Sequence, residues 1–180
     1  MSLCIIPARG GSKRIPRKNI KPFHGRPMIA WSIQAALDSK CFDHVVVSTD
    51  DAEIAETARH EGAEVPFMRP KDLSDDNTAT VPVIANVLAE IEKLWGVQSS
   101  VCCLYATAPF VQAGDIRAAR DLLDKTGADY AFPVTSFSFP IQRGVRLRYD
   151  GRMEMFQPEH ALTRSQDLEE AYHDVGQFYW

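Results

Sequence analysis

A loop close to the N-terminus contains the residue types that bind phosphate groups. It follows the apolar run Leu3–Ile6, reads PARGGSKRIPRKN over residues 7–19, and combines Gly10, Gly11 and Ser12 with five basic side chains. Glycines let backbone N–H groups approach phosphate oxygens, and arginine and lysine neutralise their charge. The spacing matches neither the P-loop nor the G-x-G-x-x-G fingerprint. The loop therefore predicts a phosphate site of another kind, suited to a triphosphate.

The position of this loop favours binding over the alternative, a surface loop whose charges are only solvated. The run Leu3–Ile6 is typical of a buried strand, so the loop leaves the carboxyl end of a first strand. In an open α/β sheet, ligands bind at that edge. We therefore expect phosphate binding.

Strand-like and helix-like patterns alternate along the first three quarters of the chain. Strands are expected over 3–7, 45–50, 63–67, 100–104 and 130–134, and helices over 28–39, 52–61, 78–95 and 115–125. Asp50 and Asp51 are placed to cap the second helix, and Asp76, Asn77 or Thr78 the third. This alternation predicts an α/β fold, a Rossmann-like, mostly parallel sheet flanked by helices, in a single domain over 1–180.

After Val134 the alternation stops. Two strand-like segments, 144–149 and 152–156, surround Asp150-Gly151, which is a strong hairpin signal. We expect residues 136–175 to form an excursion from the main sheet that serves dimerisation or the acceptor site. The final residues, 176–180, read as the start of a buried strand, so the chain is expected to lack a C-terminal segment.

Composition narrows the class of ligand. The net charge is −4 at pH 7, while basic residues concentrate in the first loop, which favours a small anionic ligand over nucleic acid. Three of the four cysteines, Cys4, Cys102 and Cys103, lie in apolar strand-like runs and are expected to be core thiols. There is no room for a signal peptide before the first strand and no apolar run long enough to span a membrane. We expect a cytoplasmic protein without membrane or nucleic-acid partners.

Several motifs together resemble the acylneuraminate cytidylyltransferases. They are PARGGSKRIPRKN at 7–19, VSTDD at 47–51, LYATAPF at 104–110, SFPIQR at 138–143, TRSQD at 163–167 and YHDVGQFYW at 172–180. The resemblance covers residues 3–180, and the later motifs are most like the branch that acts on pseudaminic acid. It implies a homodimer that binds CTP and a sugar acid. The implied reaction is transfer of CMP to the anomeric hydroxyl of a nine-carbon sugar acid, with release of pyrophosphate.

The resemblance also implies roles for residues of the nucleotide site. Arg9 and Lys18 would be catalytic, with Lys18 stabilising charge at the α-phosphate, and Asn19 would read an edge of cytosine. The roles of Lys13, Arg14 and Arg17 stay open. The expected nucleotide-binding residues are Ala8, Arg9, Gly10, Gly11, Ser12, Lys18, Asn19, Asp75, Thr78, Ala106 and Thr107. The stretch from Asp75 to Thr80 would lie near the base, or it could only cap the helix that follows.

The sugar acid needs a cation for its carboxylate, and arginine is the geometric match. Arg143 and Arg164 are the candidates, although a core or interface role for Arg143 is an alternative. The expected substrate-binding residues are Gln142, Arg143, Arg164, Gln166 and His173. Related enzymes that act on sialic acid often have glutamine at Tyr105 and arginine near Val111, so these departures suggest a differently substituted sugar.

Mg²⁺ is the implied cofactor, and its ligands in the family are an aspartate pair in a downstream D-I-D-like motif. No such motif occurs here, Asp174 does not replace it by spacing, and the ligands are expected beyond Trp180. Three alternatives stay open. The chain could use sialic, legionaminic or keto-deoxyoctulosonic acid, it could bind CTP without turnover, or it could be a structural subunit.

Overall fold

The chain forms two compact units in the computed structural model, which describes residues 1–180. The first unit comprises Met1–Pro133 and Gly176–Trp180, and the second comprises Val134–Val175. The second unit spans the segment for which the sequence predicts an excursion. The first unit contains the sheet and the four α-helices.

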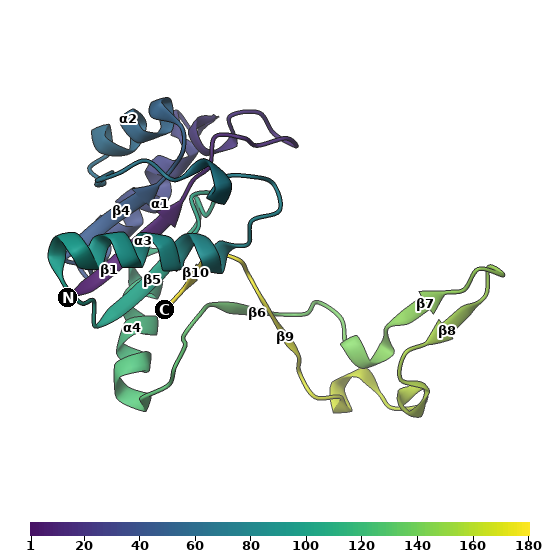
Figure 1. Cartoon of the computed structure of the whole chain (residues 1–180). Helices are drawn as coiled ribbons and strands as arrows, with labels where there is room; N and C mark the ends of the chain where they lie inside the picture. The colour runs from purple at the N-terminus through teal and green to yellow at the C-terminus, as the bar shows by residue number, and fades with distance from the viewer. The chain divides into compact units, whose positions relative to one another are not determined.

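A four-stranded sheet with the order β10-β5-β1-β4 lies at the centre of the first unit (Figure 1). Its strands are β1 (Ser2–Pro7), β4 (His44–Ser48), β5 (Ser100–Leu104) and β10 (Phe178–Tyr179). β1 pairs in parallel with both β4 and β5, whereas β10 pairs antiparallel with β5. The predicted mostly parallel sheet is therefore confirmed.

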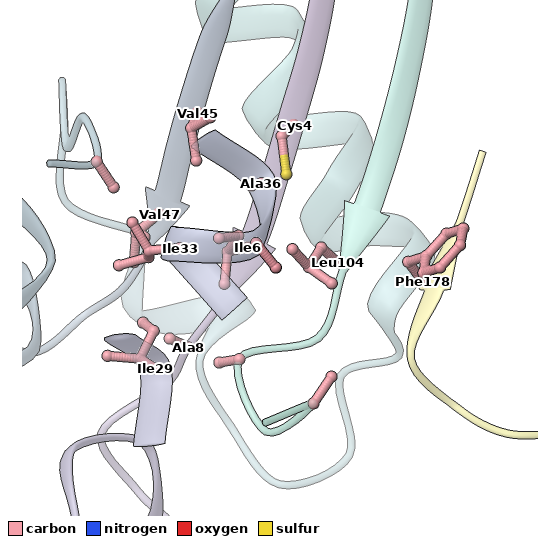
Figure 2. Packing of buried hydrophobic residues seen from close by; sticks show 14 of the residues in the cluster. Cys4, Ile6, Ala8, Ile29, Ile33, Ala36, Val45, Val47, Leu104 and Phe178 are labelled. Carbon is pink, nitrogen blue, oxygen red and sulfur yellow. The ribbon is translucent and has the colours of Figure 1, made fainter. Parts of the chain in front are cut away.

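Helices cover both faces of this sheet. α3 (Thr80–Trp95) packs on the face that carries Leu3 and Ile5, while α1 (Met28–Ser39), α2 (Ala52–His60) and α4 (Ala113–Thr126) pack on the face of Cys4 and Ile6. Side chains alternate between faces along a strand, so a strand covered on both sides must be apolar at every position. β1 meets this requirement, because Leu3 to Ile6 are completely buried. Figure 2 shows Ile6 packed among side chains of α1, β4 and β5.

Shorter elements complete the first unit. A small hairpin of β2 (Pro22–Phe23) and β3 (Arg26–Pro27) turns at His24 and Gly25, which both have positive φ. Positive φ at both central residues defines the tight turn whose twist suits a hairpin. Single 3₁₀ turns lie at Lys18–Ile20 and Lys71–Leu73.

The second unit consists of two antiparallel strand pairs and three 3₁₀ turns. β6 (Val134–Ser136) pairs antiparallel with β9 (Tyr172–Asp174), and β7 (Val145–Leu147) pairs antiparallel with β8 (Met153–Met155). The 3₁₀ turns are Ile141–Arg143, Pro158–His160 and Ser165–Asp167. The hairpin predicted around Asp150-Gly151 is confirmed.

Two predicted strands are wrong. Residues 63–67 contribute only an isolated bridge between Val46 and Glu64, because Pro66 has no N–H with which to extend the ladder. Residues 130–133 form no strand either. Instead, Ala131 and Trp180 exchange two backbone hydrogen bonds, and the strand begins after Pro133.

Two of the three predicted core thiols, Cys4 and Cys102, lie in the core, whereas Cys103 is only partly buried and faces a cavity. Cys4 and Cys102 lie opposite each other on β1 and β5 and are fully buried. Burial raises the pKa of Cys4, and it raises that of Cys103 to about 12. None of the helices is both long and apolar enough to cross a membrane.

Candidate active site

Loops at the carboxyl ends of β1 and β5 and the loop before α3 surround a cavity of about 370 Å³. Its lining residues are Pro7, Arg9, Ser12, Lys18, Asn19, Arg69, Thr78, Thr80, Tyr105, Ala106 and Thr107. Seven of the predicted nucleotide-binding residues therefore meet in one place. This volume lies in the range of small-molecule sites.

Two further cavities share Arg9 and Ser12 with the first. One, of about 460 Å³, is lined by Gly10, Gly11 and Asp75 among others. The other, of about 510 Å³, adds the basic side chains of Lys13 and Arg14. The hollow around Arg9 and Ser12 is therefore lined by several cations, which raise the local concentration of anionic ligands.

Backbone contacts fix the first loop where it leaves the sheet. The side-chain amide of the buried Asn19 donates to the Arg9 carbonyl at 2.9 Å, so the two ends of the loop are tied together. The N–H of Ala8 donates to the Ser48 carbonyl at 2.8 Å, and the Ala8 side chain packs in the core. Among the predicted nucleotide-binding residues, Ala8 alone lines none of these three cavities, whereas the other ten each line at least one.

The cations of the loop differ in whether they have partners. The Arg9 Nη1 atom lies 2.7 Å from an Asp76 carboxylate oxygen and donates to the Asp75 carbonyl at 2.6 Å. Lys13 pairs with the other oxygen of Asp76. Hydrogen bonds from Lys13, which has the larger effect, and from Arg9 lower the pKa of Asp76. Lys18 makes no ion pair, so its ammonium group is available to a ligand.

Of the two predicted roles of the segment before α3, the helix cap is wrong, while Thr78 lines the cavity. Ala79 occupies the N-cap position of α3 without a side-chain hydrogen bond, so neither Asp76 nor Asn77 caps the helix. Asp75 instead accepts hydrogen bonds from the backbone of Asn77 at 2.9 Å and from the Thr78 hydroxyl at 2.7 Å. The bonds from Thr78 and Asn77 lower the Asp75 pKa. Asp75 thereby orients Thr78 at the cavity.

Arg69 is a lining residue that the sequence did not reveal. It is 7% exposed, its Nε atom donates to the Ser48 hydroxyl at 3.0 Å, and its guanidinium donates to the Ser48 carbonyl at 2.5 Å. No carboxylate forms an ion pair with it, and burial lowers its pKa. The Asp50 carboxylate opposes this lowering but forms no ion pair with Arg69, so the site favours an anionic or electron-rich ligand. The available signal was an arginine directly after the apolar run 65–68 at the ligand edge of the sheet.

Asp50, Asp51 and Arg17 hold the loop rather than line the first cavity. Asp50 accepts the Gly10 N–H at 2.9 Å, and only Asp51 caps α2, which confirms one of the two predicted caps. Arg17 contacts both oxygens of Asp51 and also pairs with Glu53. The Arg17 guanidinium is therefore engaged.

A larger apolar cavity, of about 550 Å³, shares Thr80 and Tyr105 with the first cavity. α3 contributes one wall and β5 and β10 another. The lining residues are Thr80, Val81, Ile84, Ala85, Leu88, Val101, Cys103, Tyr105, Tyr130, Tyr179 and Trp180. The two cavities together offer a polar, cationic compartment beside an apolar one.

The residues present do not fit a magnesium site. No three acidic, histidine or cysteine side chains gather in a metal-binding arrangement. The carboxylates next to the cavities are already engaged, Asp51 with Arg17 and a helix N-terminus, and Asp76 with Arg9 and Lys13.

The five predicted acceptor residues lie in the second unit. Gln142 donates to the Glu169 carbonyl at 3.0 Å, and Arg143 donates to the carbonyls of Ala161 and Thr163, which favours a structural role for Arg143. The exposed Arg164 pairs with Asp167 at 2.6 Å. Gln166 is exposed, and the ring of His173 packs edge-on against Phe137.

Comparison with known proteins gives a consistent result. A family model described as Cytidylyltransferase matches residues 3–178. A pseudaminic acid cytidylyltransferase from Campylobacter jejuni is 46% identical over 179 residues, which are 99% of this chain and 77% of that protein. A CMP-N,N'-diacetyllegionaminic acid synthase from Legionella pneumophila is 40% identical over 125 residues, covering 69% of this chain and 54% of that protein.

Solved structures agree with this fold. A CMP:2-keto-3-deoxy-manno-octonic acid synthetase complexed with CTP superposes with a TM-score of 0.68 at 20% identity. The match covers 99% of this chain and 73% of the other.

Proposed function

The chain belongs to the cytidylyltransferase family, and we propose that it transfers CMP from CTP to the anomeric hydroxyl of pseudaminic acid. The observation that carries this proposal is the cavity where Arg9, Ser12, Lys18 and Asn19 meet Thr78, Ala106 and Thr107. These residues combine phosphate-binding cations with the polar groups needed to hold a nucleoside. The 46% identity to the Campylobacter protein favours pseudaminic acid as the acceptor.

In this reaction the sugar hydroxyl oxygen attacks the α-phosphorus of CTP. The bond between the α-phosphorus and the bridging oxygen breaks, pyrophosphate leaves, and the hydroxyl proton is released. Negative charge shifts onto phosphate oxygens during the step, so fixed cations accelerate it. We assign the stabilisation of that charge to Lys18, which lines the cavity without an ion-pair partner, and the binding of the triphosphate to Arg9.

The apolar cavity supports a sugar with apolar substituents. Pseudaminic acid carries acetamido groups and deoxygenated carbons, which make part of its surface apolar. This surface would pack against apolar lining residues such as Val81, Ile84 and Tyr179. Tyr105 and Thr80 line both cavities and would lie between the nucleotide and the acceptor. We also propose Gln142, Arg164, Gln166 and His173 as acceptor ligands, whereas the two carbonyl contacts of Arg143 favour a structural role.

The test is pyrophosphate release with CTP and Mg²⁺, measured separately with pseudaminic, N,N'-diacetyllegionaminic and N-acetylneuraminic acid. Release with pseudaminic acid at a kcat/KM at least about tenfold above the others would support the proposal. Preference for another of these sugars would identify that sugar as the acceptor and would still support the proposed CMP transfer. CTP binding without pyrophosphate release in the presence of any of the three sugars would leave only a nucleotide-binding role.

The proposal also includes a cytoplasmic homodimer. CTP is a cytoplasmic metabolite, and the hairpin of the second unit carries the exposed apolar side chains Leu147, Tyr149 and Met153. Exposed apolar side chains that cluster on one element often form subunit contacts. Sedimentation that finds only monomer at micromolar concentration would contradict the homodimer.

A further inference from the structure

The phosphate-binding loop is held at both ends by neighbouring carboxylates from the start of α2. At one end, Asp50 accepts the N–H of Gly10 at 2.9 Å. At the other end, Asp51 accepts two hydrogen bonds from the Arg17 guanidinium, one of them at 3.0 Å. The loop between these anchors contributes Gly10, Gly11 and Ser12 to the cavities.

Arg17 immediately precedes Lys18 and determines where the chain turns. Its φ of 56° lies in the left-handed region, which is unusual for a residue with a side chain. Its carbonyl accepts the N–H groups of Ile20 at 3.0 Å and Lys21 at 2.9 Å, and it is the N-cap of the 3₁₀ turn that begins with Lys18. A displacement of Arg17 therefore displaces Lys18.

Asp51 is itself fixed to the body of the first unit. One carboxylate oxygen accepts the N–H groups of Glu53 and Ile54, both at 3.0 Å, which caps α2. The same side chain contacts the loop sterically, because a Cβ atom added to Gly10 would lie 2.7 Å from its Oδ2 atom. Hydrogen bonding by Arg17, more than any other interaction, lowers the Asp51 pKa, so the carboxylate is ionised at neutral pH.

We propose that Asp51 is a positioning residue for the transferase reaction, which acts through Arg17 to hold Lys18 toward the α-phosphate. The inference rests on the proposed function of Lys18. Arg17, in this view, is no phosphate ligand, because its guanidinium is committed to Asp51 and Glu53.

Asp51→Asn separates the two roles of Asp51. Asparagine caps helices as well as aspartate does, so α2 keeps its cap while the ionic anchor of Arg17 is lost. We expect kcat to fall about 10- to 100-fold, because misplacement of a catalytic group by an ångström has an effect of this size. The KM for CTP should change less than about threefold, since the ligand-binding side chains remain.

Two further variants sharpen the kinetic test. Glu53→Gln removes the second carboxylate that pairs with Arg17. The Glu53 carboxylate is exposed and caps no helix, so this change should lower kcat less than Asp51→Asn does. Arg17→Gln should lower kcat as much as Asp51→Asn, and the double variant should be no worse than either single one. Additive losses would overturn the proposed coupling.

Hydrogen exchange gives a readout that does not depend on turnover. In Asp51→Asn, amides of residues 10–20 should exchange at least about tenfold faster, while those of α2 stay within about twofold of the wild type. Equal acceleration in α2 and the loop would show that Asp51 only caps the helix, and no acceleration in the loop would also refute the anchor. If the wild type released no pyrophosphate, the proposed function would fail, yet these exchange rates would still decide whether Asp51 orders the loop.

Discussion

Replacement of Arg69 by methionine tests whether the buried guanidinium serves the ligand or the fold. Methionine fills a similar apolar volume without a charge. The change removes the two side-chain hydrogen bonds to Ser48, each worth about 1.5–3 kcal/mol because the donor is charged. The Ser48 carbonyl still accepts the Ala8 N–H at 2.8 Å, so it does not become an unsatisfied buried group.

An opposing contribution reduces this loss. Burying the guanidinium costs several kcal/mol, which the Asp50 charge offsets only in part, and the substitution removes that cost. The two contributions nearly cancel, so we expect the ligand-free variant to lose only about 1–2 kcal/mol, a fall in Tm of about 3–6 °C for a chain of this size. A charge-assisted contact to CTP is worth about 2–3 kcal/mol, so its loss should raise the Kd about 30- to 150-fold.

Thermal unfolding with and without CTP, together with calorimetric titration, measures both quantities in the same two proteins. The decisive comparison is the rise in Tm that CTP produces, which should nearly vanish in Arg69→Met at a concentration that saturates the wild type. If the variant kept the wild-type rise but lost more than about 4 kcal/mol of stability without ligand, Arg69 would be a structural residue.

Five other substitutions test the site. Lys18→Ala should lower kcat about 10²- to 10³-fold without changing Tm, as measured by pyrophosphate release; near-normal turnover would remove Lys18 from the catalytic step. Gly10→Ala should lower Tm, because its Cβ would meet the Asp51 side chain at 2.7 Å, whereas Gly11→Ala, with nothing within 4 Å, should stay within about 1–2 °C. Asp76→Asn should lower the Kd for CTP about two- to fivefold in calorimetry at low salt and less at high salt, because the carboxylate competes with phosphate for two loop cations. The ion pair lowers the Asp51 pKa below its ordinary 3.8, so its stabilisation is present above that value and lost on acidification. The Tm difference between wild type and Asp51→Asn should therefore shrink from about pH 6 to about pH 3, and a constant difference would contradict the ionic contribution.

Patterns that are local in sequence allowed much of the fold to be predicted. The apolar period of 28–39 predicts α1 with its observed bounds, and the uninterrupted apolar run Leu3–Ile6 predicts a strand covered on both faces. The gathering of Arg9, Ser12 and Lys18 follows from one short loop at the end of β1, so it too is local.

Contacts between distant segments could not be predicted in the same way. The role of Asp51 depends on Arg17, 34 residues earlier, and that of Asp76 on Arg9, 67 residues earlier. Hydrophobic periodicity carries no information on which charged side chains will pair. The short apolar run 63–67 satisfied the strand pattern, but Pro66 limits it to a bridge.

The insertion of the second unit into the first affects the order of events during synthesis. β5 receives its antiparallel neighbour β10 only after the 42 residues of Val134–Val175 have been made. At about 5–20 residues per second, translation of this insertion takes roughly 2–8 seconds. During that interval the edge of β5 and the contact surface of Phe178 stay uncovered on the ribosome-bound chain. The nascent protein therefore carries an open sheet edge that favours chaperone binding or aggregation, until Phe178 and Tyr179 pair with Leu104 and Cys103 of that edge.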